Sequence, residues 1–480
     1  MTGNDERVVV AIGVVSGVGL ALRGLEPTGS LVLDWLLLVA VAAGAVWACA
    51  SAPWWTLAGI AGIATAVADT WLPLLAGAVT FGLALASGLT RRSQPVERAV
   101  VAGASMLVFS LSRELGAWGV NTLLAVAAVA TAVGFGVYRR SRRDRRTALV
   151  VMGVAASLAV VAVLGLLVAA TTARPHLSEG DRAARQGLNQ LKRADFDAAQ
   201  ESFGRAADAF DRAEADLGAL WAQPARLVPI ASQHRRAAAD ISAASAAAAS
   251  TIEQQLRQID IGAIGIEDGR VDIDAVKGLE APLVELQGAI DDLDSAVESS
   301  ESGWLVAPIQ RRLDDLAADI ETQQELGERA LEAIEVAPDV LGEDDERVYF
   351  VMFTTPAEAR GQGGFMGNYA EITIADGLIE LTTLGRHSEL SRGGERPRHL
   401  EDAPEDWLAR YGQFGFQMGP DGDVGSVPWS NITMSPHFPS TAQVVAELYP
   451  QSGGRPIDGV FSIDVFVMED LVGLVGPVQL

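Results

Sequence analysis

A group of basic side chains in the C-terminal third of the sequence has residue types suited to anion chemistry. The group consists of Arg386, His387, Arg392, Arg396, Arg398 and His399, with Glu389 and Glu395 between them. It stands out because residues 174–480 hold only 24 basic against 53 acidic residues. Arginine can bind two oxygens of a phosphate or carboxylate at once. Two interpretations remain open: an anion-binding loop with Arg392, Arg396 and Arg398 as ligands, and a solvated loop without a ligand.

A second cluster is rich in glycine. Gly361, Gly363 and Gly364 directly follow Arg360. Glycines in such a run let backbone amides approach a phosphate, and they also serve turns that need a positive φ angle. The segment lacks the Lys and Ser/Thr pair that completes a phosphate-binding loop. Gly363 and Gly364 are therefore candidate ligand-binding residues with a structural alternative.

Carboxylates in the same region are candidates for metal binding. Asp464 follows an expected strand, where a carboxylate serves either a metal or the cap of the next helix. Glu358 and Glu371 are further candidates. The five histidines show no metal-ligand spacing, so the sequence assigns no metal ligands, and it shows no Ser-centred nucleophile elbow.

Strands mixed with helices must position these residues. We expect strands at 347–353, 365–375, 378–384 and 457–463, and helices at 439–449 and 465–475. Asp376-Gly377 predicts a two-residue hairpin turn between two of the strands. Residues 339–480 are therefore predicted to form a layered α/β domain.

The segment before this domain, residues 174–338, has apolar residues at helical spacing. Ser178 with Asp181 resembles a capping box, from which a helix is expected to run to Arg193. After a turn at Ala194–Asp195 a second helix returns, giving one tetratricopeptide-type hairpin. Further helices are expected at 237–259, 276–297 and 309–334, with an extended excursion at 261–273. We interpret the segment as an extracytoplasmic helical stalk.

An apolar stripe in the last of these helices indicates how the stalk packs. Its members are Leu313, Leu316, Ile320 and Leu326. Their spacing predicts the core face of an antiparallel bundle.

The first 173 residues contain seven apolar stretches that fit membrane-spanning helices. They run approximately over 8–22, 31–50, 54–68, 71–89, 99–111, 118–138 and 148–170. Trp54, Trp55, Trp71 and Trp118 stand at the ends of these runs, where interfacial anchors belong. Gly13 and Gly17 form a small-xxx-small pair suited to close helix contact. Asp34, Asp69 and Glu114 lie near run ends, which favours interfacial placement over an ion relay.

Arginine placement predicts the orientation of these helices. One cluster is Arg91, Arg92 and Arg98, and another is Arg139, Arg140, Arg142, Arg143, Arg145 and Arg146. Two helices separate the clusters, so both face the same side, the cytoplasm. The alternate connections hold only Arg23 and Arg113. We therefore expect the N-terminus inside, the chain after residue 170 outside, and a multi-pass protein of a bacterial plasma membrane.

Composition agrees with a membrane class and excludes others. Hydrophobic residues make up 49% of the 480, and the formal net charge of -25 divides into about +4 before residue 174 and -29 after it. An acidic soluble part repels phosphate backbones, so we expect no nucleic-acid partner. The single cysteine, Cys49, excludes an intramolecular disulfide. Heavy use of Arg, Ala and Gly is typical of an actinobacterial genome.

Three ordered blocks resemble the bacterial family of domain of unknown function 4012 (DUF4012). The first is Glu358-Ala359-Arg360-Gly361-Gln362-Gly363-Gly364-Phe365 with Gly367, Tyr369 and Asp376-Gly377, and the second is Trp429, Asn431, Pro436, Phe438-Pro439 and Ala442. The third is Asp458-Gly459-Val460, Asp464 and Gly476-Pro477-Val478. Thr355 departs from the Asn common at its position. The family pattern continues past residue 478, so we expect a fragment with later strands missing.

The same layout is more distantly similar to the LytR–CpsA–Psr family of membrane-anchored glycopolymer transferases. That resemblance implies that Arg360 and Arg386 grip a lipid pyrophosphate and that Asn431 lies in the ligand-binding segment. Pyrophosphate transfer uses cations and usually a divalent metal such as Mg²⁺ held by carboxylates, which makes Arg360, Arg386 and Asp464 the catalytic candidates. Here His387 follows Arg386, and the Arg–Asp pairs of that family are absent.

Three functions remain as hypotheses. The first is a non-catalytic envelope scaffold or glycopolymer-binding protein. The second is a LytR–CpsA–Psr-like phosphotransferase acting on lipid-pyrophosphate-linked cell-wall glycopolymer, and the third is a transporter-associated membrane protein. The partners expected are membrane lipid and a lipid-linked glycopolymer or peptidoglycan.

Overall fold

The computed structural model describes residues 3–90, 94–111, 119–259, 265–416 and 428–475. The chain divides into two compact units. We call Met1–Arg257 with Glu285–Leu326 the helical unit, and Gln258–Val284 with Gly327–Leu480 the α/β unit. Several residues singled out above lie outside the described ranges: Arg91, Arg92, Arg113, Glu114, Trp118 and Gly476-Pro477-Val478.

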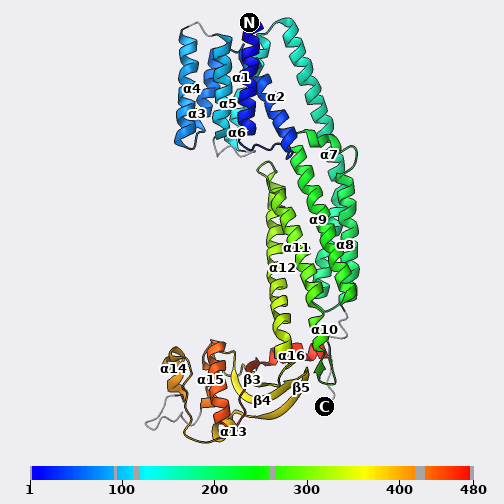
Figure 1. Cartoon of the computed structure of the whole chain (residues 1–480), viewed down its shortest axis with the longest axis vertical. Coiled ribbons are helices and arrows are strands. Elements are labelled where there is room, and N and C mark those ends of the chain that lie inside the picture. Colours follow the sequence, from blue (N-terminus) through cyan, green and yellow to red (C-terminus); the bar gives the residue numbers. More distant parts are fainter. Residues whose placement is uncertain (1–2, 91–93, 112–118, 260–264, 417–427, 476–480) are drawn as a thin grey trace. The chain divides into compact units, whose positions relative to one another are not determined.

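The helical unit begins with apolar helices at the positions expected from the sequence (Figure 1). They are α1 (Gly3–Ala21), α2 (Leu31–Cys49), α3 (Trp54–Ala66), α4 (Trp71–Leu89), α5 (Pro95–Leu111), α6 (Val120–Tyr138) and α7 (Arg142–Leu191). Within the described residues, α2, α4, α6 and α7 are long and apolar enough to cross a membrane. Their buried core includes Val46, Leu57, Ile60 and Phe109.

Two glycines allow α1 and α2 to pack closely. A Cβ added at Gly13 would lie 2.6 Å from the Cα of Ala43, and one at Gly17 would lie 2.5 Å from the Cα of Val39. No larger side chain fits at those distances, so the backbones meet where the small residues are. The small-xxx-small interpretation of this pair is confirmed.

Helix α7 is continuous over 50 residues and passes through the apolar segment into the acidic one. Pro175 and Ser178 lie inside it, so the capping box predicted at Ser178 and Asp181 is wrong. The side chain of Ser178 accepts a hydrogen bond from Arg182 at 3.3 Å instead. A capping motif has no orphan amides to satisfy where a helix has already formed upstream.

The hairpin expected after α7 is present. Its turn uses Ala194 at a φ of 56°, and the side chain of Asp195 caps α8 (Phe196–Leu217) by accepting from the amide of Ala198. A short 3₁₀ turn η1 (Gln223–Leu227) leads to α9 (Ala231–Gln258). Phe203 and Leu256 pack with buried alanines between these helices.

The last two long helices are α11 (Glu280–Ser300) and α12 (Ala307–Val340). Leu313 and Ile320 are buried, and Leu316 packs against the same cluster with Val297 of α11. These residues confirm the predicted core face. Leu326 does not belong to it, because half of its surface is exposed.

Among the described residues of the α/β unit, six strands form one mixed sheet, in the order β1-β2-β5-β4-β3-β6. The strands are β1 (Ile266–Glu267), β2 (Arg270–Val271), β3 (Arg347–Thr355), β4 (Phe365–Ala375), β5 (Leu378–Arg386) and β6 (Gly459–Ile463). Strand β6 runs parallel to β3, and the other pairs are antiparallel. Asp376 and Gly377 both have positive φ angles, as a type I′ hairpin turn requires.

The extended excursion before α11 adds to this sheet. Strands β1 and β2 form a small hairpin, Arg270 pairs with Leu378 of β5, and α10 (Ile273–Lys277) follows. Of the segment 261–273 that was predicted to be extended, residues 261–264 lie outside the described residues and Ile273 already begins α10. The sequence did not predict that the strands between them would pair with Leu378, more than 100 residues later.

Short helices cover the sheet and enclose an aromatic core. They are α13 (His387–Arg392), α14 (Glu405–Tyr411), η3 (Gly412–Phe414), η4 (Pro428–Ser430), η5 (Ile432–Met434), α15 (Phe438–Gln451) and α16 (Val465–Val475). Phe350 of β3 is fully buried, with ring centroids at 4.7 Å from Tyr449 and 5.5 Å from Trp429. This packing fixes the segments that carry the candidate site residues.

Candidate functional site

The structure brings Arg360 and Asn431 together. Nη1 of Arg360 donates to Oδ1 of Asn431 at 3.0 Å and to Sδ of Met434 at 2.7 Å. Nη2 of Arg360 pairs with Glu358 at 2.9 Å, and only 16% of the arginine side chain is exposed. The Asn431 amide in turn donates to the carbonyl of Phe414. Arg360 is therefore held by neighbours in its own unit and links the β3–β4 loop to the segment around η5.

The glycines beside Arg360 serve this close packing. Gly363 has a φ of 79°, where a side chain is strained. A Cβ at Gly364 would overlap the carbonyl oxygen of Thr355, and one at Gly361 would overlap the backbone of Met434. The structural alternative for the glycine run accounts for all three positions.

Two polar side chains, Gln362 of this loop and Thr433 of η5, were not singled out as site candidates by sequence reasoning. The amide of Gln362 donates to the carbonyl of Thr433 at 3.2 Å. The side-chain amide atoms of Gln362 and the hydroxyl of Thr433 are buried without a protein partner in the structure. Buried polar groups are nearly always hydrogen-bonded, so these atoms are exceptions to the rule. Gln362 belongs to the first motif block and Thr433 lies between Asn431 and Pro436 of the second, and this is the signal that could have drawn attention to them.

Arg386 has a different environment from Arg360. It lies exposed at the end of β5, in register with Asn368 of β4. The ring of Phe365 is 5.8 Å from the guanidinium carbon of Arg360 and 4.9 Å from the ring of His387. Phe365 thus contacts Arg360 and also His387, the residue that follows Arg386.

Three arginines of the basic group donate hydrogen bonds to backbone carbonyls of α13. Arg398 is fully buried and donates to the carbonyls of Leu390 and Ser391 at 3.0 and 3.3 Å. Arg396 donates to the Ser391 carbonyl, and Arg392 to that of Ser388. The bonds to Leu390 and Ser391 satisfy carbonyls that a helix leaves orphaned at its C-terminus. Arg398 therefore belongs neither to an exposed ligand loop nor to a solvated one.

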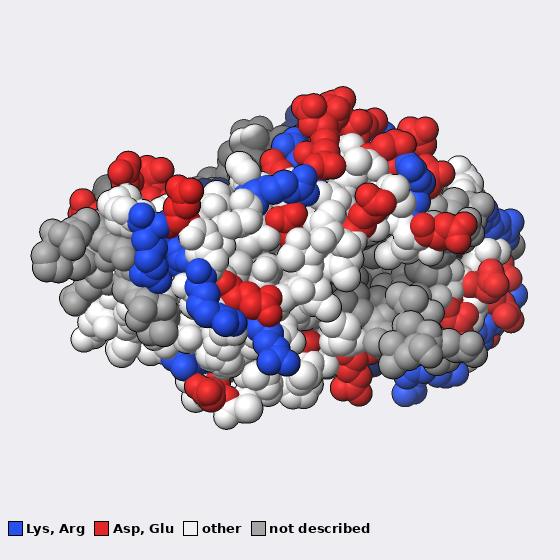
Figure 2. Space-filling view, turned by 90° about the horizontal axis from the view of Figure 1, so that it is seen from below, with Lys and Arg blue, Asp and Glu red and all other residues white. Residues whose placement is uncertain are grey.

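Some of these basic side chains remain accessible. Arg386, Arg392 and Arg396 are exposed. The face drawn in Figure 2 shows basic side chains in a short diagonal band, bordered by acidic ones. A band of basic side chains can attract an anion locally, even though the surrounding surface is acidic.

Asp464 caps α16. Its Oδ1 accepts from the amides of Phe466 and Val467 at 2.9 and 2.8 Å, as an N-cap carboxylate does. In the part of the chain that the structure describes, no group of three or more His, Cys, Asp or Glu residues could hold a metal ion. Asp464 is therefore not part of such a group among the described residues, and its visible contacts are those of a helix cap.

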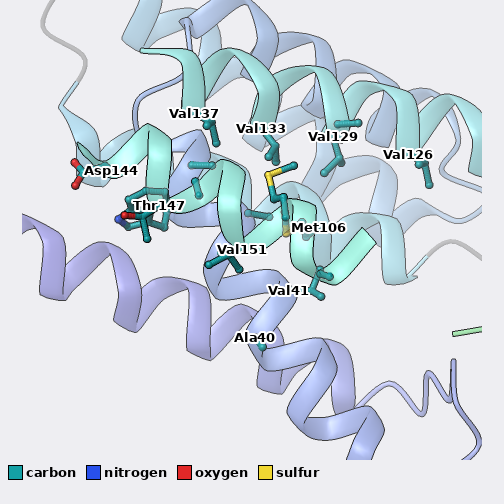
Figure 3. A pocket seen from close by; sticks show the side chains of 18 of the residues that line it. Ala40, Val41, Met106, Val126, Val129, Val133, Val137, Asp144, Thr147 and Val151 are labelled. Carbon is teal, nitrogen blue, oxygen red and sulfur yellow. The ribbon is translucent and has the colours of Figure 1, made fainter. Parts of the chain in front are cut away.

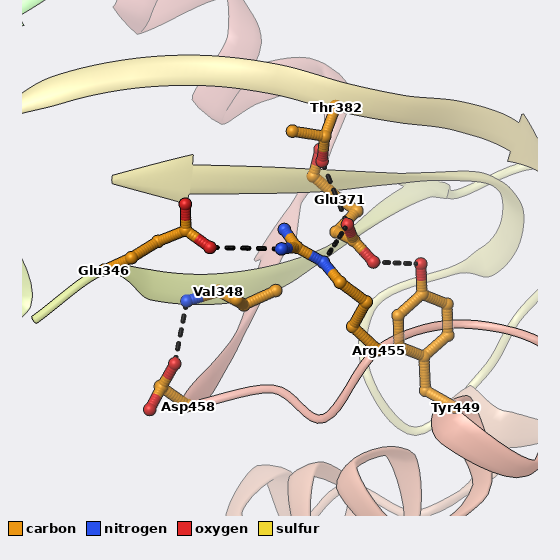
Figure 4. A network of polar contacts seen from close by, with 7 residues as sticks. All are labelled: Glu346, Val348, Glu371, Thr382, Tyr449, Arg455 and Asp458. Atoms are coloured by element: carbon orange, nitrogen blue, oxygen red, sulfur yellow. Dashed lines mark hydrogen bonds and ion pairs between the residues drawn. The ribbon is translucent and has the colours of Figure 1, made fainter. Parts of the chain in front are cut away.

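Glu371 is the centre of a buried polar network (Figure 4). This carboxylate of β4 is 5% exposed. It accepts hydrogen bonds from Tyr449 at 2.8 Å, Thr382 at 3.0 Å and Arg455 at 3.1 Å. Burial alone would raise the pKa of Glu371, but these three donors outweigh burial and lower it below its ordinary value. Burial and the adjacent carboxylate raise the pKa of Tyr449.

The same network ties the segment before β6 to β3. Arg455 also pairs with Glu346 at 3.0 Å. Asp458 accepts from the amide of Val348 at 2.7 Å and from Arg347 at 3.2 Å. The charged residues thus fix the parallel β3–β6 pair, and the Asp-Gly-Val block of the sequence has this structural role.

Comparison with known proteins assigns the C-terminal part of the chain. The family model described as "Protein of unknown function (DUF4012)" matches residues 344–480. No curated protein and no solved structure matches the chain. The matched residues contain β3 to β6, the Arg360 loop and the Glu371 network. Residues 344–480 of this chain belong to the DUF4012 family.

Proposed function

We propose that this chain is a multi-pass membrane protein that carries its DUF4012 domain outside the cytoplasm, as a non-catalytic envelope scaffold or glycopolymer-binding protein. The seven apolar helices, with arginines concentrated from the end of α6 through the first turns of α7, are what this topology requires.

Contacts at the ends of the apolar helices support the same topology. The N-terminal Glu6 accepts from Trp47 at the end of α2, and the guanidinium of Arg140 lies 4.1 Å from the Trp47 ring. With seven spans these three positions all fall on the cytoplasmic side. On the other side, the amide of Ile230 donates to the carbonyl of Pro27 at 3.0 Å. An odd number of spans is needed to bring the chain after α7 to the α1–α2 connection.

The contacts of Arg360 favour binding over catalysis. A transferase of the LytR–CpsA–Psr type would use Arg360 and Arg386 together on a pyrophosphate. Arg360 is instead occupied by Glu358, Asn431 and Met434. Asp464 is likewise occupied by capping. This commitment of Arg360 is the observation on which the non-catalytic proposal rests.

One observation keeps the transferase as a second candidate. Arg386 is exposed at the end of β5, and Leu384 on the same strand is 65% exposed. An exposed cation beside exposed apolar surface is the chemistry that a lipid pyrophosphate would recognise.

Two assays on the full-length protein in detergent separate the candidates. In the first, geranylgeranyl pyrophosphate and Mg²⁺ are supplied and released phosphate is measured. The proposal expects no release above the protein-free rate. Release that Arg386→Ala abolishes would show pyrophosphate cleavage that depends on this arginine, and would contradict the non-catalytic proposal.

The second assay measures co-sedimentation with isolated cell-wall sacculi. The proposal expects retention that is weakened by charge reversal of the exposed basic residues, in the double variant Arg392→Glu and Arg396→Glu. Arg410→Glu, an exposed arginine of α14 outside that group, is the matched control. Retention that is absent, or equally sensitive to the control, would contradict glycopolymer binding.

A further inference from the structure

An apolar groove of about 1040 Å³ lies among α2, α5, α6 and α7. Figure 3 shows a row of valines from α6 along it, with Met106 of α5 and Val41 of α2 beside them. The row consists of Val126, Val129, Val133 and Val137. About three turns of one helix therefore present the same apolar face to the groove.

One end of the groove is polar and basic. Arg143, Asp144 and Thr147, from the first turns of α7, line it there. Trp47 also lines the groove, with the guanidinium of Arg140 over its ring. Tryptophan and arginine together are typical of the level where hydrocarbon meets headgroups.

The groove is bordered by a helix that packs loosely. Only 6% of the most apolar window of α7 is buried. Val151 lines the groove and is still 61% exposed. In a bilayer, apolar surface of this kind is in contact with lipid, so a hydrocarbon chain has access to the groove from the side.

We propose that this groove binds one anionic phospholipid, with an acyl chain along the α6 valines and the phosphate at Arg143. The site rests on the membrane placement proposed above. Charge complementarity selects the headgroup, because six arginines and one aspartate lie between residues 139 and 146. Basic pockets between transmembrane helices on the cytoplasmic side bind anionic headgroups in this way.

The same charge argues against a second copy of the chain as the occupant. In a parallel pair of identical chains, the arginine segment of each copy lies at the same depth as that of the other. A helix from a second copy would thus bring like charges together at the mouth of the groove. A phospholipid supplies the opposite charge and needs no partner in register.

Native mass spectrometry of full-length protein extracted from nanodiscs tests the proposal. The nanodiscs contain palmitoyl-oleoyl phosphatidylglycerol and phosphatidylethanolamine in equal amounts. Arg143→Ala removes the phosphate contact, and Arg146→Ala is its matched control, because Arg146 faces a separate hollow with Leu149 and Val150. Val151→Trp fills the groove, and Val154→Trp changes an equally exposed valine of α7 outside it.

We expect wild type to retain one phosphatidylglycerol in preference to phosphatidylethanolamine. Arg143→Ala should lower that retention about five-fold, the change that ~1 kcal/mol per arginine near a membrane surface implies, and Val151→Trp should abolish it. Both control variants should retain the lipid as wild type does. Equal retention of the two lipids, or no effect of either groove variant, would overturn the proposal. So would a Val151→Trp protein that changes from dimer to monomer with its lipid retention intact.

Carbonate-resistant membrane association of each variant is measured first. If a variant still inserts into the membrane but no longer retains the lipid, the change reports on the groove and not on membrane placement. Failure of wild type to insert would contradict the membrane placement itself, so the two outcomes are distinguishable.

Discussion

The amide of Ile230 donates a 3.0 Å hydrogen bond to the carbonyl of Pro27, across more than two hundred residues of sequence. Arg236 strengthens the same connection by donating to the carbonyl of Gly29 at 2.8 Å. The start of α9 is therefore fixed to the connection between α1 and α2. If the apolar helices span a bilayer, both segments must lie on one side of it, and the arginine pattern predicts that this side is the exterior.

Arg360 should matter for stability, because its bonds join the β3–β4 loop to Asn431. We expect Arg360→Ala to cost about 1.5–3 kcal/mol of local unfolding free energy, the usual range for hydrogen bonds to a charged group. Hydrogen exchange of the β3 and β4 amides in the full-length protein measures it. The exposed Arg386→Ala should change exchange by less than about 0.5 kcal/mol. Equal effects of the two variants would contradict the structural role given to Arg360.

Arg398 should be more sensitive than the other arginines of its group. Its side chain is fully buried and satisfies two carbonyls at the end of α13. Arg398→Ala leaves those carbonyls unpaired and opens a cavity, so we expect a loss of about 2–5 kcal/mol in urea unfolding. Arg392→Ala, at an exposed position, serves as the control and should be nearly neutral. A stable Arg398→Ala protein would disprove this assignment.

The Glu371 network should make stability depend on pH. The pKa of Glu371 is lowered in the folded protein, so its contribution is complete above the ordinary value of 4.5. It is then lost as the pH falls from there through the lower folded pKa. Glu371→Gln should destabilise the α/β unit at pH 7 and flatten this acid dependence in thermal unfolding.

Glu380→Gln is the control for this experiment, because Glu380 is an exposed carboxylate on neighbouring β5. Its acid dependence should equal that of wild type. An unchanged acid dependence in Glu371→Gln would show that the network does not hold the carboxylate ionised.

Gly17 should tolerate no added methyl group, because α1 meets α2 at that point. Gly17→Ala should destabilise the helical unit by about 1–3 kcal/mol through overpacking. Gly82→Ala in α4, where a Cβ would meet nothing within 4 Å, should instead stabilise by about 0.5–1 kcal/mol through helix propensity. Thermal unfolding in detergent measures the sign of the stability change in each variant. The same sign in both would contradict the close approach of α1 and α2.

The sequence predicted most elements because each was signalled locally. Apolar runs and helical periodicity located the helices, and Asp376-Gly377 with its flanking alternation located the β4–β5 hairpin. The unit boundaries within α11 and α12 were not predicted, nor was the continuity of α7. The backbone hydrogen bonds of a helix do not depend on whether its side chains are apolar or acidic. A change in composition therefore does not show whether the helix ends or continues.

The candidate site was harder to predict because residue type does not reveal burial. Arg398 and Arg392 look alike in the sequence, yet one is enclosed and the other exposed. The pairing of Arg360 with Asn431 depends on how two distant loops pack. Glu371 was identified only as a carboxylate, because Tyr449 and Arg455 reach it from segments that no spacing connects to β4.

Cysteine accessibility in spheroplasts tests the proposed topology most directly. The native Cys49 is buried, so single exposed cysteines can be placed by Glu201→Cys on α8, Glu395→Cys beyond α13 and Ser141→Cys before α7. A membrane-impermeant maleimide should label Glu201→Cys and Glu395→Cys in intact spheroplasts, and Ser141→Cys only after permeabilisation. Labelling of Ser141→Cys in intact spheroplasts, with protection of the other two until lysis, would contradict the account.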